Sequence, residues 1–175
     1  MSTERDDLIT MLDGQREMFR IAVTGVSDEQ ARSRSTVSEL TLGGLLHHLG
    51  ATERHWLKVI ADKDENAEFD TTGAATAYVM TAEQTLADQL AKWEAAAAAT
   101  NQVIHTHPNL DELVPLPTAP WQPEREWWTV RQVLLHIYRE VAHHSGHADI
   151  IREAIDGQNT TYTRAGIDPE QAFPQ

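Results

Sequence analysis

Seven of the nine histidines of this 175-residue chain gather in two stretches, one around His48 and the other around His144. Neutral imidazole is a common ligand of divalent metals and a general acid or base near neutral pH. The second stretch also holds Glu140, four residues before His144, and side chains at this spacing lie one turn apart on one helix face. The chain contains no cysteine, which excludes a thiolate metal site, a disulfide framework and a cysteine nucleophile. The chemistry to expect is that of a metal held by nitrogen and oxygen ligands.

Apolar residues recur at helical spacing from 130 to 156, which predicts a helix. With about 100° of rotation per residue, His144 lies about 20° from the centre of the apolar face. Glu140 and His147 lie at the edge of that face, whereas His143 points away from it. A histidine inside an apolar face needs a hydrogen-bond partner or a metal, because burying an unpaired polar group is costly.

The stretch 42–61 has the same helical periodicity and carries the first group of histidines. His48 borders its apolar face, and His47 is expected to face solvent on the opposite side. His55 shares the stripe of His48, but it lies seven residues further on, roughly 10 Å along the helix axis. One ion is therefore not expected to bind both. In the later helix, His136 lies at a marginal position outside the apolar face.

Two predicted helices thus direct His48 and the group Glu140, His144 and His147 toward one interior. Any one of these residues alone is more often a satisfied core histidine or a solvated charge than a ligand. Their convergence on one stripe is what favours a metal. Imidazole and carboxylate suit Zn²⁺, with Ni²⁺ or Fe²⁺ as alternatives. Three or four such ligands in a bundle core, with room for water, are typical of a catalytic site.

The elements that must position these residues are all helical. Thr41 and Thr129 stand where helix N-caps belong, and Gly157 stands where the last helix should end. No stretch shows strong strand-like alternation, and five prolines interrupt the segment 108–123. We predict an all-α four-helix bundle with a long Pro-rich connection before the last long helix. The predicted long helices are 4–24, 42–61, 74–106 and 130–156, with a short helical turn starting near residue 27.

Length and charge limit the domain organisation and the partners. We expect one domain over residues 1–175, with its core at about 5–157 and a C-terminal extension, 158–175, that runs extended over the surface. With 14 basic and 27 acidic residues, the net charge is −13. This charge argues against binding nucleic acid or an anionic membrane surface. No apolar run approaches the roughly 20 residues of a membrane span, and no signal peptide is recognisable, so we expect a cytoplasmic protein.

Two motifs resemble a known superfamily. The stretch TLGGLLHHLGATERHW at 41–56 resembles the second-helix signature of the DinB-like superfamily. The stretch EVAHHSGHADIIRE at 140–153 is similar to that superfamily's last-helix signature, in the actinobacterial branch related to mycothiol-dependent enzymes. The resemblance extends from about residue 5 to 157. The two signatures together are fairly specific, whereas either alone is weak.

The resemblance implies a four-helix bundle in which three ligands hold a divalent metal, one from the second helix and two from the last. Carried over, the second-helix ligand is His48, and the other two are Glu140 and His144. In the superfamily these two are often both histidine, and the glutamate resembles the one in mycothiol-dependent maleylpyruvate isomerase. His147 stands where many relatives have glutamine. The ligand set can therefore be His48/Glu140/His144, His48/His144/His147, or all four residues.

The resemblance also implies a function. We expect a metal-dependent enzyme that transfers a low-molecular-weight thiol, mycothiol, to a small electrophile bound near the Trp-containing loop 108–128. A coordinated thiol has a lowered pKa, and since the sulfur comes from the co-substrate, the protein needs no cysteine. No catalytic side chain is predicted beyond the metal ligands. The alternatives are a metal-dependent hydrolase and a non-enzymatic, stress-related metal-binding bundle, and the family makes a homodimer an expectation.

Overall fold

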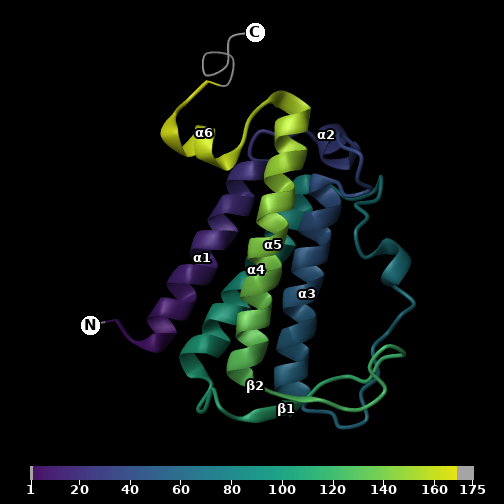
Figure 1. Cartoon of the computed structure of the whole chain (residues 1–175), viewed down its shortest axis with the longest axis vertical. Coiled ribbons are helices and arrows are strands. Elements are labelled where there is room, and N and C mark those ends of the chain that lie inside the picture. The colour runs from purple at the N-terminus through teal and green to yellow at the C-terminus, as the bar shows by residue number, and fades with distance from the viewer. Residues whose placement is uncertain (1, 169–175) are drawn as a thin grey trace.

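Four long helices form the body of the molecule (Figure 1). The computed structural model describes residues 2–168. Helix α3 packs against α4 and α5, and α1 packs against α5, so that the four helices enclose one core. The predicted all-α bundle is confirmed. The long helices are α1 (Glu4–Val23), α3 (Leu42–Asp62), α4 (Leu86–Thr106) and α5 (Val130–Asp156).

A threonine caps the N-terminus of each long helix. Each threonine side chain accepts a hydrogen bond from a backbone N–H of the first turn, which satisfies a donor that has no partner within the helix. Gly157 ends α5 with a φ of 78°, a left-handed conformation that glycine adopts without strain. The caps predicted at Thr41 and Thr129 and the stop at Gly157 are confirmed; the other two caps are Thr3 and Thr85.

The predicted helix over 74–106 is wrong in its first part. A short 3-10 helix, η1 (Ala74–Thr76), is followed by an irregular segment, and α4 begins only at Leu86. We call residues 77–85 the strap. Its residue Met80 is 5% exposed and packs against α3, and this tertiary contact prevails over the weak helix propensity of the segment. The alanine-rich stretch that motivated the prediction lies within α4 itself.

The remaining elements are short. Helix α2 (Asp28–Arg32) agrees with the predicted helical turn. The Pro-rich connection contains two strands, β1 (Leu113–Pro115) and β2 (Trp127–Thr129), which pair antiparallel at one end of the bundle (Figure 1). At three residues each, they are too short to show alternation in the sequence. In the extension predicted to be extended, residues 160–165 instead form α6 (Thr160–Ala165), and 169–175 lie outside the described residues.

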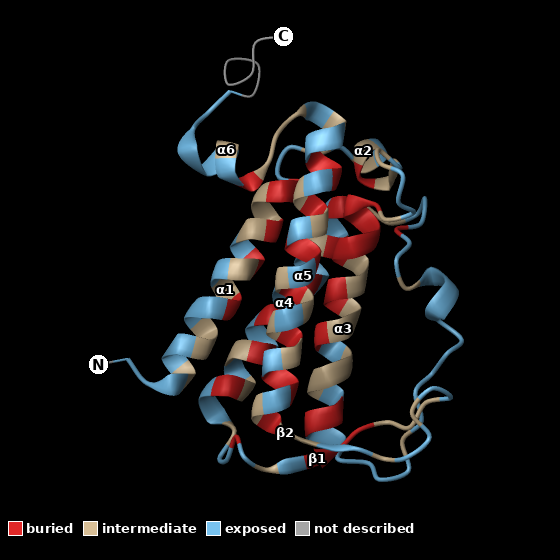
Figure 2. Cartoon of the chain, viewed as in Figure 1, coloured by how far each residue is buried: buried red, intermediate tan, exposed pale blue. Residues whose placement is uncertain are grey.

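The buried residues follow the inner faces of the long helices (Figure 2). One polar cluster lies among them: the Arg16 guanidinium of α1 forms an ion pair with the Glu53 carboxylate of α3, and both side chains are almost fully buried. Trp93 Nε1 and Thr100 Oγ1, both of α4, each donate a hydrogen bond of 2.8 Å to Glu53. The cluster therefore joins three helices with its charges paired. Within residues 2–168, no helix is long and apolar enough to cross a membrane.

Candidate metal centre

Helices α3 and α5 bring three of the four predicted ligands together. Glu140 Oε2 lies 3.6 Å from His48 Nε2 and 3.7 Å from His144 Nε2. All three ligand atoms lie within 4.8 Å of one another, and His144 is 5% exposed. The i, i+4 spacing of Glu140 and His144 aligns them on α5, while α3 presents His48 from the facing helix. In the part of the chain that the structure describes, this is the one group of histidines and acids with metal-binding geometry.

The geometry of the group fits a divalent metal. Zinc bonds of about 2.0–2.1 Å in a tetrahedral site separate neighbouring ligand atoms by about 3.3 Å. The two distances from Glu140 Oε2 exceed this value by a few tenths of an ångström. Since the three atoms lie within 4.8 Å of one another, the group would have to contract to close around one ion. Three ligands also leave one coordination position for a substrate.

The electrostatics of the group favour metal binding as well. Hydrogen bonding with His48, together with the nearby His136 and His144, lowers the pKa of Glu140 to about 2. Burial and the neighbouring His48 lower the pKa of His144 to about 4. At neutral pH the carboxylate is therefore ionised and the His144 imidazole is neutral. Both are the forms that bind metals.

His147, the fourth predicted ligand, lies one turn further along α5. Its Nδ1 is 3.2 Å from His144 Nδ1, which is the ring nitrogen that does not face Glu140. Burial lowers the pKa of His147, and so does the nearby His143. The position of His147 is that of a hydrogen-bond partner that orients a ligand imidazole. His143 is exposed, in agreement with its outward projection.

Several neighbours of the group were not predicted. Tyr78 of the strap stacks on His48, with 4.1 Å between ring centroids and 20° between planes. Its pKa is raised by burial and by Glu140. His136 Nε2 lies 3.8 Å from Glu140 Oε1, and burial lowers the pKa of His136. The i, i+4 spacing of His136 and Glu140 was a usable signal, whereas nothing local in the sequence marks Tyr78. His47, expected to face solvent, is instead half-buried with its Nδ1 3.1 Å from Oε1 of Gln89 on α4.

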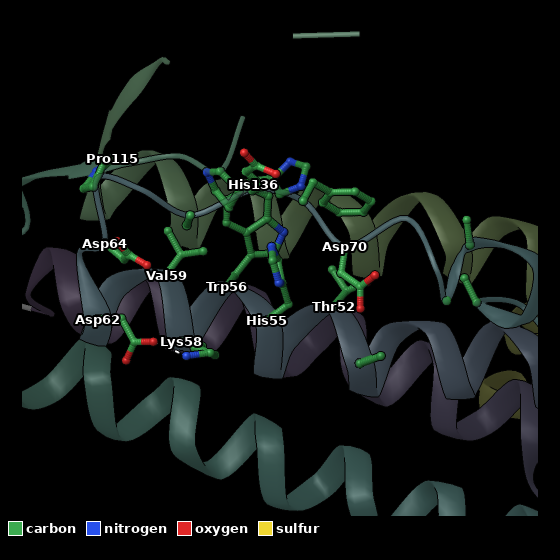
Figure 3. Close-up of a pocket in the computed structure, with 18 of the residues that line it drawn as sticks. Thr52, His55, Trp56, Lys58, Val59, Asp62, Asp64, Asp70, Pro115 and His136 are labelled. Atoms are coloured by element: carbon green, nitrogen blue, oxygen red, sulfur yellow. Dashed lines mark hydrogen bonds and ion pairs between the residues drawn. The ribbon is translucent and has the colours of Figure 1, made fainter. Parts of the chain in front are cut away.

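A cavity of about 790 Å³ opens beside the ligand group, and both His48 and Glu140 line it. Trp56 and His136 lie side by side in its wall, with 4.8 Å between ring centroids (Figure 3). Burial also lowers the pKa of His55, which lines the same cavity and packs edge-on against Phe69. The predicted loop contributes only its prolines 115 and 117. Many of the other lining residues belong to the segment 62–77. The sequence pattern did not connect this segment with the site.

The bundle and its His–Glu–His group define a protein of the DinB-like class. The family model described as mycothiol-S-transferase matches residues 7–157, and the chain belongs to this family. A solved structure from Enterococcus faecalis, titled as a conserved protein of its locus, has the same fold with a TM-score of 0.68 at 16% identity. The alignment covers 90% of this chain and 100% of that one. No curated protein matches the sequence. The predicted membership of the DinB-like superfamily is confirmed.

Proposed function

We propose that the protein is a metal-dependent thiol S-transferase that joins mycothiol to a small electrophile. The proposal rests mainly on the placement of His48 and Glu140. Both belong to the ligand group, and both line the cavity of about 790 Å³. A thiol that enters the cavity can therefore reach the open coordination position. Membership of the mycothiol S-transferase family supports mycothiol as the thiol.

In this proposal the chain's residues have distinct roles. His48 Nε2, Glu140 Oε2 and His144 Nε2 hold the metal, for which zinc is the first candidate. When bound, such a metal lowers the pKa of a coordinated thiol and so supplies a thiolate at neutral pH. His147 keeps His144 oriented through the Nδ1 contact. Trp56 and Phe69 offer apolar surface to the body of the electrophile.

The reaction balances without a cysteine in the chain. The thiol proton is released to solvent, the sulfur forms a bond to an electrophilic carbon, and the leaving group departs with its bonding electrons. For an epoxide, the ring oxygen takes up a proton instead. No oxidant or reductant is needed. The residues that would hold the metal undergo no net change in this reaction.

The experiment is elemental analysis of the purified protein, followed by incubation with mycothiol and monobromobimane. We expect about one equivalent of divalent metal and conjugate formation above the uncatalysed rate. Removing the metal with a chelator should abolish the catalysed rate, and adding it back should restore the rate. Turnover of ester or amide substrates without thiol would support the hydrolase alternative. Metal-loaded protein that turns over neither class would support the non-enzymatic one.

A further inference from the structure

Two consecutive glycines of α3 let the strap lie directly on the helix that carries His48. A Cβ atom on Gly44 would lie 2.0 Å from the backbone oxygen of Tyr78, and one on Gly43 would lie 2.4 Å from Met80 Sδ. A side chain at Gly44 would have to move the strap backbone, whereas one at Gly43 would first displace the Met80 side chain. Met80 is buried against this surface. The glycine pair thus fixes where the backbone of Tyr78 runs.

Helix α2 fastens the other half of the strap. Arg32 donates to three backbone carbonyls, those of Thr81 at 3.1 Å, Ala82 at 3.4 Å and Gln84. Asp28 Oδ1 accepts from the Leu86 N–H at 2.7 Å, where α4 begins. With both halves anchored, the strap holds Tyr78 in place even though this residue is 37% exposed.

The Tyr78 hydroxyl approaches the ligand nitrogen of His48. The oxygen lies 3.2 Å from His48 Nε2, while Thr52 Oγ1 lies 3.4 Å and Glu140 Oε2 3.6 Å from the same atom. One ring nitrogen engages one partner well. When His48 Nε2 is committed to a metal, the two hydroxyls lose that partner and need another. Thr52 can turn to the carbonyl four residues earlier in its own helix. The Tyr78 hydroxyl, on a partly exposed residue, would then be free to bond to a group bound in the site.

We propose that Tyr78 is a substrate-binding residue whose hydroxyl donates a hydrogen bond to the sulfur of the thiol held beside His48. This inference rests on the proposed function, because it takes a thiol as the group in the open position. The hydroxyl lies 3.2 Å from a ligand nitrogen, at the edge of the cavity that Ala77 lines, so a group bound next to that nitrogen would come within its reach. A donor at this place favours the thiolate over the thiol, since a hydrogen bond to a charged acceptor is stronger than one to a neutral acceptor.

The test uses cobalt-loaded full-length protein and N-acetylcysteine as the probe, with the visible absorption of the cobalt as the signal. The variant Tyr78→Phe keeps the stacked ring and removes only the hydroxyl. We expect the cobalt content and the thiol-free spectrum to equal those of the unaltered protein, and the affinity for N-acetylcysteine to fall at least about 10-fold. Gly44→Ala should weaken thiol binding similarly by displacing the strap. Gly14→Ala is the control, because a Cβ there meets nothing within 4 Å.

Three outcomes overturn the inference. Equal thiol affinity in Tyr78→Phe and the unaltered protein would show that the hydroxyl does not contact the sulfur. A thiol-free spectrum altered by Tyr78→Phe would make the hydroxyl a metal ligand instead. An unaltered protein whose spectrum does not respond to N-acetylcysteine would remove the thiol from the site. The proposed transferase activity is judged separately by conjugate formation, so thiol binding without conjugation would refute that activity and leave the role of Tyr78 standing.

Discussion

Glu140 is the residue on which the candidate centre depends most. One of its carboxylate oxygens faces His48 and His144, and the other faces His136, so that it lies between three imidazoles. Its pKa of about 2 keeps it ionised at any pH at which the protein is expected to work. A negative charge there offsets the charge of a divalent cation. A third imidazole at that place would be neutral as a ligand and would not offset the charge of the cation.

We expect His144→Ala to lose stoichiometric metal and His48→Ala to bind metal at least ~10-fold more weakly, because each removes one of three ligands. The helical content should remain in both variants. The control is His143→Ala, whose side chain is exposed, and we expect unchanged metal content and a stability change within about 0.5 kcal/mol. Elemental analysis and far-ultraviolet circular dichroism measure these effects. Full metal content in both ligand variants would refute the site.

Acid should destabilise the metal-free protein in two intervals. The pKa of His144 in the folded state, about 4, is below its ordinary value of 6.5, so the unfolded state binds more protons between these values. Its contribution to stability is present above pH 6.5 and is lost as the pH falls through 4. Glu140 contributes in the same direction, and its contribution, present above 4.5, is lost as the pH falls through about 2.

The measurement is the free energy of unfolding by urea across a pH series, for metal-free protein. We expect the loss between pH 6.5 and 4 to be smaller in His144→Gln, which cannot take up a proton. In metal-loaded protein, protons compete with the ion for the imidazoles, so metal release is expected between roughly pH 6 and 4. An identical pH dependence in His144→Gln and the unaltered protein would contradict the assignment.

The sequence predicted the residues that share one helix better than those that meet across helices. Glu140 and His144 followed from a four-residue spacing, and His48 from the apolar face of its own helix. The contact between His147 and His144 depends on which ring nitrogen of His144 faces Glu140. No periodicity in the sequence encodes that choice. Tyr78 reaches His48 from 30 residues away through an irregular segment. Such a contact is decided by tertiary packing alone.

At the level of the elements, the Arg16–Glu53 ion pair holds α1 and α4 against the helix that carries His48. Both oxygens of the carboxylate are engaged, by Arg16, Trp93 and Thr100. Asp13 and Asn101 complete the cluster at Arg16 Nη1, at 2.8 Å each. Because Arg16 is fully buried, removal of Glu53 would leave its charge paired only with the half-exposed Asp13.

We therefore expect Glu53→Ala to destabilise the protein by about 3–5 kcal/mol, the typical cost of breaking a buried ion pair. The control is Glu17→Ala, since the Glu17 carboxylate is largely exposed in its pair with Arg20, and pairs of that kind contribute about 0–1 kcal/mol. Urea denaturation of both variants, each compared with the unaltered protein, measures the difference. Equal stability of the two variants would show that the cluster does not hold the helices together.

The start of a long helix was predictable where a capping threonine precedes an apolar period, as at Thr41 and Thr129, whereas the start of α4 after Thr85 was missed. The segments that the sequence placed wrongly lack such local signals. The strap avoids helix because two glycines on another element accept Tyr78 and Met80. The strands pair across an 11-residue connection, residues 116–126, in a Pro-rich segment. The path of the strap and the pairing of the strands both depend on contacts between distant parts of the chain. Local propensity does not predict such contacts.

The molecule has a net charge of −13, and acidic residues also line the cavity. Five carboxylates line it, from Asp62, Asp64, Glu68, Asp70 and Glu140. The lysine among the described lining residues, Lys58, forms an ion pair with Asp62. Hydrogen bonds from Thr72 lower the pKa of Asp70, which keeps that carboxylate ionised. An entering molecule therefore meets an apolar wall surrounded by negative charge.

The negative charge around the cavity predicts a preference among electrophiles. We expect 1-chloro-2,4-dinitrobenzene to be conjugated faster than the anionic 4-chloro-3,5-dinitrobenzoate, by roughly 3- to 10-fold after each rate is divided by its uncatalysed rate, because like charges at the mouth repel the carboxylate. The preference should shrink as salt rises, since exposed charges are screened. It should also shrink in the double variant Glu68→Gln/Asp70→Asn, which removes two of the lining charges without touching the ligand group. Initial rates measured at low and high salt decide the matter, and equal use of both electrophiles by the unaltered protein at low salt would show that the cavity does not select by charge.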